Sequence, residues 1–114
     1  MEPILKVQGD VYFVKTEELP SWVKLVTPRG GRYVLARGEA TGHAHAIEDT
    51  ENVTLYEVNG TLYLKVDNPV TVVHEEHKPI NLEPGIWRVG IQREYDYFEL
   101  VYRNVYHIVR PIRD

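Results

Sequence analysis

The stretch from Asn52 to Val66, NVTLYEVNGTLYLKV, decides the fold class. In its second half, TLYLKV (61–66), leucine and valine alternate with threonine, tyrosine and lysine, as in a half-buried strand. The first half, NVTLYEV (52–58), is equally rich in β-branched and aromatic residues. Asn59-Gly60 joins the halves and readily adopts the positive φ angles of a type I′ turn. The stretch therefore predicts a β-hairpin.

Similar apolar runs, separated by turn-forming residues, extend in both directions from this hairpin. Because no convincing helix alternates with them, we expect an all-β fold rather than a parallel βαβ sheet. We expect one domain over residues 1–114, a small barrel or sandwich of about seven to ten short, mostly antiparallel strands. The segment 98–109 is long enough for a helix, although its β-branched and aromatic content favours a strand. The further expected strands are 11–16, 22–27, 32–38, 70–76 and 86–92.

Composition excludes several function classes. The chain has 114 residues, a formal net charge of −4 and no cysteine. Without cysteine there are no disulfides, thiolate metal ligands or cysteine nucleophiles. The acidic balance gives no general attraction to nucleic acid, which makes that partner unlikely on composition. Since no apolar run is long enough to cross a membrane and the first residues do not resemble a signal peptide, we expect a cytoplasmic protein with no membrane partner.

Histidines form the most informative pattern, because four of the five occur in two short motifs. In His43-Ala44-His45, an extended backbone would place both imidazoles on one face. In His74-Glu75-Glu76-His77, the second histidine joins the first only if the chain turns after position 76, which Lys78-Pro79 favours. Imidazole is a good ligand for divalent Zn, Fe, Mn or Ni.

The two motifs together predict a divalent metal site. Three protein ligands would leave a position for water or substrate, as in an enzyme, whereas four would close the coordination sphere in a structural site. The alternative is that the histidines lie on the surface and pair with nearby carboxylates. The expected metal ligands are His43, His45, His74 and His77, with Glu75 and Glu76 as further ligands or proton acceptors.

A second group with chemical potential is Gln92-Arg93-Glu94-Tyr95. Arg93 could hold an anionic ligand, and Glu94 or Tyr95 could transfer a proton. The alternative is a structural Arg–Glu pair beside a packed tyrosine. Pro28 to Arg32, PRGGR, lacks the lysine and the strand–loop–helix context of a phosphate-binding loop, and it predicts a simple hairpin turn.

Two segments resemble the motifs of cupins. Gly38 to His45, GEATGHAH, is similar to the first cupin motif, and Leu82 to Trp87, LEPGIW, is similar to the proline-glycine hairpin of the second. The resemblance implies a cupin-like barrel, a metal held by His43 and His45, and metal-dependent catalysis. The sequence departs from the cupin pattern at Arg88, where cupins carry a histidine.

A closer resemblance links the chain to a family of small uncharacterised bacterial and phage-encoded proteins. It rests on four blocks: Gly38 to His45, Leu62 to Val66, His74 to Val89 and Gln92 to Tyr95. This resemblance implies no settled activity. The phage-borne relatives suggest a non-enzymatic alternative, a self-assembling structural or accessory protein of a phage particle or filament. The protein would then be a homo-oligomer located in a virion or filament, with the histidines structural or at subunit interfaces.

A third option is a small-molecule binding module. In that case the mouth of the fold would hold an anionic ligand on the histidines and Arg93.

Overall fold

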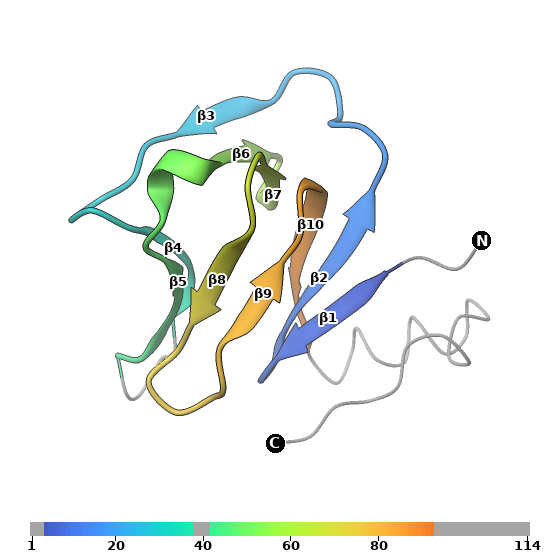
Figure 1. Ribbon diagram of the computed structural model, residues 1–114. Coiled ribbons are helices and arrows are strands. Elements are labelled where there is room, and N and C mark those ends of the chain that lie inside the picture. The colour runs from blue at the N-terminus through green and yellow to red at the C-terminus, as the bar shows by residue number, and fades with distance from the viewer. Residues whose placement is uncertain (1–3, 38–41, 93–114) are drawn as a thin grey trace.

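The computed structural model describes residues 4–37 and 42–92, which fold into two antiparallel sheets that face each other (Figure 1). The described strands form a sandwich rather than a closed barrel, so the all-β prediction is confirmed with the sandwich as its architecture. The six-stranded sheet has the order β1 (Leu5–Gln8), β2 (Val11–Thr16), β10 (Gly85–Ile91), β7 (Thr61–Val66), β6 (Val53–Val58) and β3 (Lys24–Val26). The four-stranded sheet has the order β4 (Tyr33–Arg37), β5 (Ala44–Ile47), β8 (Val70–Val73) and β9 (Ile80–Leu82). A 3₁₀ turn, η1 (Thr50–Asn52), precedes β6.

The hairpin expected from the sequence is present as β6 and β7. Its register runs from Val53 opposite Val66 to Val58 opposite Thr61. The connecting Asn59 and Gly60 have φ angles of 49° and 83°, as a type I′ turn requires. The local sequence signal was therefore sufficient to fix this hairpin and its register.

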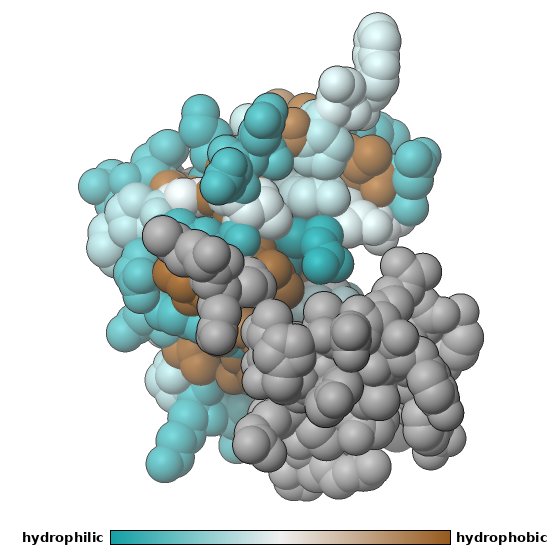
Figure 2. Space-filling model, turned by 90° about the vertical axis from the view of Figure 1, so that its right-hand side faces the viewer, coloured by the Kyte–Doolittle hydropathy of each residue, from teal (hydrophilic) through white to brown (hydrophobic). Residues whose placement is uncertain are grey.

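The core lies between the two sheets, and on strands such as β2, β4 and β8 buried residues alternate with partly exposed ones. Trp87, on the central strand β10, is fully buried and is the largest side chain of the core. Exposed hydrophobic residues form small, separate patches among hydrophilic ones on the face that Figure 2 shows. The core residues are Val11, Phe13, Val53, Leu55, Leu64, Val66, Trp87 and Val89 from the larger sheet, and Tyr33, Leu35, Ile47, Val70, Val72 and Leu82 from the smaller one.

Some strands differ from the prediction. The strand expected over 22–27 covers only Lys24–Val26, since Trp22 has a φ of 64°, which a strand cannot accommodate. The strand expected over 70–76 ends at Val73, where the chain bends. Strands β1 and β9 were not predicted, and β5 was anticipated only as an extended backbone at His43-Ala44-His45. The segment 98–109 lies outside the described residues. Among the residues that the structure does describe, no helix is long and apolar enough to cross a membrane.

Lys6 links the two sheets at one edge. Its Nζ donates to the carbonyl oxygen of Asn81 at 2.6 Å and pairs with Glu83 Oε1 at 2.8 Å. The same ammonium lies 5.8 Å from the centre of the Trp87 ring, whose Nε1 donates to the Glu83 carbonyl at 2.9 Å. These contacts join β1 to the turn between β9 and β10.

The Lys6 hydrogen bond lowers the pKa of Glu83 below its ordinary value of 4.5. Since the charged form is favoured in the folded state, the contribution to stability is complete above pH 4.5 and is lost as the pH falls through the lowered pKa. We expect Glu83→Gln to lose less stability than the wild type on acidification below pH 4.5, measured by urea unfolding at a series of pH values. The exposed Glu17→Gln serves as the control. Parallel pH profiles for Glu83→Gln and the wild type would contradict this prediction.

Candidate metal centre

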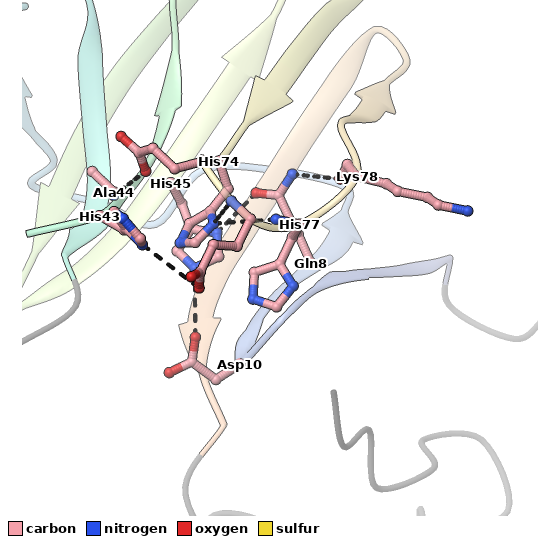
Figure 3. Close-up of polar contacts among 10 residues, drawn as sticks. Gln8, Asp10, His43, Ala44, His45, His74, His77 and Lys78 are labelled. Carbon is pink, nitrogen blue, oxygen red and sulfur yellow. Dashed lines mark hydrogen bonds and ion pairs between the residues drawn. The ribbon is translucent and has the colours of Figure 1, made fainter. Parts of the chain in front are cut away.

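Three separate segments bring polar side chains together at one end of the sandwich (Figures 1 and 3). Gln8 and Asp10 come from the end of β1 and the turn that follows it. His43 and His45 lie at the start of β5. The third segment is the bend that follows β8, which carries the His74-Glu75-Glu76-His77 motif. The sheet order places β5 next to β8, so the two histidine motifs become neighbours.

The His74 side chain shapes the bend after β8. Its Nδ1 accepts hydrogen bonds from the backbone N–H groups of Glu76, at 3.0 Å, and His77, at 3.3 Å. These bonds fold the chain back on itself, which explains why the strand stops before this residue. The fold also brings the His77 ring to 4.6 Å from the His74 ring, centre to centre. The turn that His77 needed in order to approach the other histidines is therefore present.

His45 is almost completely buried, with an exposed fraction of 4%. Its Nδ1 donates to Gln8 Oε1 at 2.8 Å, and its Nε2 lies 3.5 Å from Asp10 Oδ1. Its ring centre lies 4.3 Å from that of His74. Burial, followed by the charge of His74, lowers the pKa of His45 below 6.5. The ring is therefore neutral at pH 7.

Gln8 holds His45 and the bend in place at the same time. The side chain is 2% exposed, and its Nε2 donates to the carbonyl oxygens of Val72 and Lys78, each at 2.9 Å. Both amide hydrogens are thus used, and the amide oxygen accepts from the His45 ring. One side chain on β1 consequently braces the residues on both sides of the His74 bend.

The two glutamates of the motif have different surroundings. Glu75 Oε1 accepts a hydrogen bond from the backbone N–H of Ala44 at 2.9 Å, which ties the bend to β5. That bond is the main cause that lowers the pKa of Glu75 below 4.5, so the group is a carboxylate at neutral pH. Glu76 is exposed, and its Oε1 lies 3.6 Å from His43 Nδ1.

His43, His74 and Glu75 have the arrangement of a metal-binding group. Each offers one ligand atom, and the three atoms lie within 4.8 Å of one another. Ligand atoms around a tetrahedral zinc ion are about 3.4 Å apart, given metal–nitrogen distances of about 2.0–2.1 Å. Since none of the three side chains is fully buried, burial does not prevent the side-chain rotations that coordination of an ion would require.

The hydrogen bonds of His74 determine how its ring can bind. Since Nδ1 accepts two backbone N–H groups, the proton of the neutral ring resides on Nε2. The single lone pair of Nδ1 is therefore already shared by two N–H groups, and a metal bound at Nδ1 would displace both. Ligation through Nε2 would move the proton to Nδ1 and break both backbone hydrogen bonds. Two imidazoles and a carboxylate otherwise fit the preferences of zinc, iron and manganese.

Comparison with known proteins identifies a family. Residues 7–92 match DUF8820, a domain of unknown function. The chain belongs to this family. No curated protein and no solved structure matches the chain. The DUF8820 region includes both histidine motifs and Gln8, and it ends at Gln92.

The DUF8820 structure brings together the histidines that the sequence singled out. The rings of all four lie in a series of contacts, because the His43 and His74 centres are also only 5.7 Å apart. Which of them bind a metal stays a prediction. The predicted groups Arg93, Glu94 and Tyr95 lie outside the described residues.

Sequence reasoning missed Gln8 and Asp10. The signal available was Gly9-Asp10, a turn dipeptide between two apolar runs, which predicts a β-hairpin. That hairpin is present, with Gln8 opposite Val11. Nothing in the local sequence indicates that the glutamine is buried, because its partners are 37 to 70 residues away.

Proposed function

We propose that this DUF8820 domain binds one divalent transition metal, Zn, Fe, Mn or Ni, at the end of the sandwich. The ligands are His43 and Glu75 together with His74. One observation carries the proposal. The three ligand atoms lie within 4.8 Å of one another, although they come from two segments, one before β5 and one after β8. Carboxylate and imidazole are both strong ligands for such ions.

The two remaining histidines have different roles in this proposal. His77 is the candidate fourth ligand, since its ring centre lies 4.6 Å from that of His74. His45 donates its Nδ1 proton to Gln8 and is not one of the three residues whose ligand atoms converge, so in this proposal it supports the centre by packing against His74. The cupin resemblance instead makes His45 a ligand, and the variants described below separate the two assignments.

With three protein ligands, the centre retains a position for water or a substrate. A bound metal would supply Lewis-acid chemistry and a water of lowered pKa there. Glu76, an exposed carboxylate 3.6 Å from His43 Nδ1, is positioned to accept a proton at that place. We therefore propose metal-dependent catalysis in addition to metal binding. Catalysis requires that His77 does not bind the metal, because a fourth protein ligand would fill the position for water or substrate.

Metal stoichiometry tests the proposal. Tag-free protein is treated with EDTA, dialysed against each of the four ions in turn and analysed by mass spectrometry for metal per chain. We expect one ion per chain, lost in His43→Ala and His74→Ala but kept in His45→Gln. The matched control is Asp67→Asn. Asp67 lies in the turn before β8, at the opposite end of that strand from His74. A wild-type protein that takes up no metal, or His43→Ala and His74→Ala variants that bind as well as it does, would overturn the proposal.

A second candidate function is self-assembly into a structural or accessory particle. It is favoured by β3, a short edge strand on which Leu25 is 60% exposed, and by the neighbouring Trp22, which is 94% exposed. Such an edge can pair with the same strand of a second copy. Analytical sizing over a range of concentrations tests this, because a strictly monomeric protein would exclude it. Leu25→Lys should abolish any association that occurs through this edge.

A further inference from the structure

A second site is indicated by a cavity of about 420 Å³ that shares no residue with the metal centre. Arg29 and Arg32, on the turn before β4, and Arg37, at the end of that strand, contribute to its wall. Another part of the wall is apolar and consists of Val26, Val34 and Leu55. No acidic residue lines the cavity within the part of the chain that the structure describes.

The turn itself holds two of these positive charges side by side. Arg29 and Arg32 form an antiparallel bridge and exchange two backbone hydrogen bonds, of 2.9 Å and 3.2 Å. Gly30 and Gly31 close the turn with φ angles of 59° and 78°, values that other residues rarely adopt. Like charges directly opposite each other across such a pair are destabilising. The repulsion between the two guanidinium groups therefore destabilises the free protein, and a bound anion would relieve it.

Within the part of the chain that the structure describes, no counter-charge offsets this arginine cluster. Among residues 4–37 and 42–92, the ion pairs involve Lys6, His43 and His45, and none involves an arginine. The same residues supply no side-chain hydrogen bond to Arg29, Arg32 or Arg37. The chain has a net charge of −4, yet this cavity is lined by three guanidinium groups that have no carboxylate partner among the described residues.

We propose that the cavity binds a small organic phosphate. A phosphate monoester carries a charge of about −1.5 to −2 at pH 7 and three acceptor oxygens, which suits several guanidinium groups better than one carboxylate does. The volume of about 420 Å³ lies in the range of pockets for small ligands and exceeds what a bare phosphate fills. Val26, Val34 and Leu55 would then contact the organic part of the ligand.

Phenyl phosphate is the probe, titrated by calorimetry into EDTA-treated protein so that no metal contributes. We expect saturable binding at one site per chain, weaker binding of benzoate and of inorganic phosphate, and none of phenol. Arg29→Gln and Arg32→Gln should each weaken phenyl phosphate binding by at least about tenfold, as expected for the loss of a charged hydrogen-bond donor. Arg88→Gln, on β10 and outside this cavity, should leave the binding unchanged.

Stability provides an independent readout. Because Arg29→Gln removes repulsion, the unliganded variant should unfold at a temperature no lower than the wild type. His74→Ala should bind phenyl phosphate normally, so failure of this proposal is distinguishable from failure of the metal proposal. The proposal is overturned if phenyl phosphate does not bind, if phenol binds equally well, or if only a single-stranded oligonucleotide binds.

Discussion

A saturating divalent metal is expected to raise the free energy of unfolding by about 2.7 kcal/mol when the free ion is at one hundred times its Kd. The gain arises because the ion binds the folded chain, in which His43 and His74 meet although 31 positions (74 − 43) separate them in the sequence. In the unfolded chain these ligands are not held together, so the binding free energy becomes folding free energy. Urea unfolding with zinc and with EDTA measures the difference.

The decisive comparison is the metal-dependent increment in each variant rather than its absolute stability. His74→Ala removes a proposed ligand and also the acceptor of two backbone hydrogen bonds, so its metal-free form should already be less stable than the wild type. We expect its increment on adding zinc to be close to zero, whereas Asp67→Asn keeps the full increment. An equal increment in His74→Ala and in the wild type would place the binding elsewhere on the chain.

Local sequence was sufficient for the strands whose boundaries depend on turn chemistry. The alternation in 61–66 and the Asn59-Gly60 turn determine β7 and its pairing with β6 almost without reference to the rest of the chain. The same reasoning placed β2, β4 and β10 to within one or two residues. Composition alone could not decide between a barrel and a sandwich, because that depends on which strand edges pair over long distances.

The strand boundaries that were predicted wrongly depend on interactions that sequence patterns do not encode. The run VTVVHEE reads as one strand, yet it ends at Val73 because the His74 ring captures two backbone N–H groups. That capture also turns His77 toward the other rings. An apolar pattern predicts where a strand can form, whereas a side-chain hydrogen bond decided where this one ends.

The candidate site was only partly predictable for the same reason. Histidine spacing singled out the four imidazoles and two glutamates that lie together at this end of the sandwich, because these residues cluster in the sequence itself. Gln8 and Asp10 reach the site only through the tertiary fold, since β1 is close to neither motif along the chain. The opposed arginines Arg29 and Arg32 belong to a turn that was predicted, but their shared cavity requires β3 and β6 as well.

Gln8→Leu is expected to lower the free energy of unfolding by about 3 kcal/mol. The substitution leaves three partners without their hydrogen bonds, the carbonyl oxygens of Val72 and Lys78 and the His45 ring. Each unsatisfied buried group costs about 1–3 kcal/mol. The leucine is of similar size and recovers about 1 kcal/mol or more by its apolar burial. The net loss is large for one side chain on a short strand.

The same substitution should weaken metal binding by about tenfold, because Gln8 braces the chain on both sides of the His74 bend. Urea unfolding without metal and dialysis with zinc measure the two effects separately. The matched control is Thr71→Val, which removes an exposed side-chain hydrogen bond to Asn81 from the neighbouring strand and should cost less than about 1 kcal/mol. If Gln8→Leu proved as mild as Thr71→Val, this glutamine would not be what holds the bend against β1.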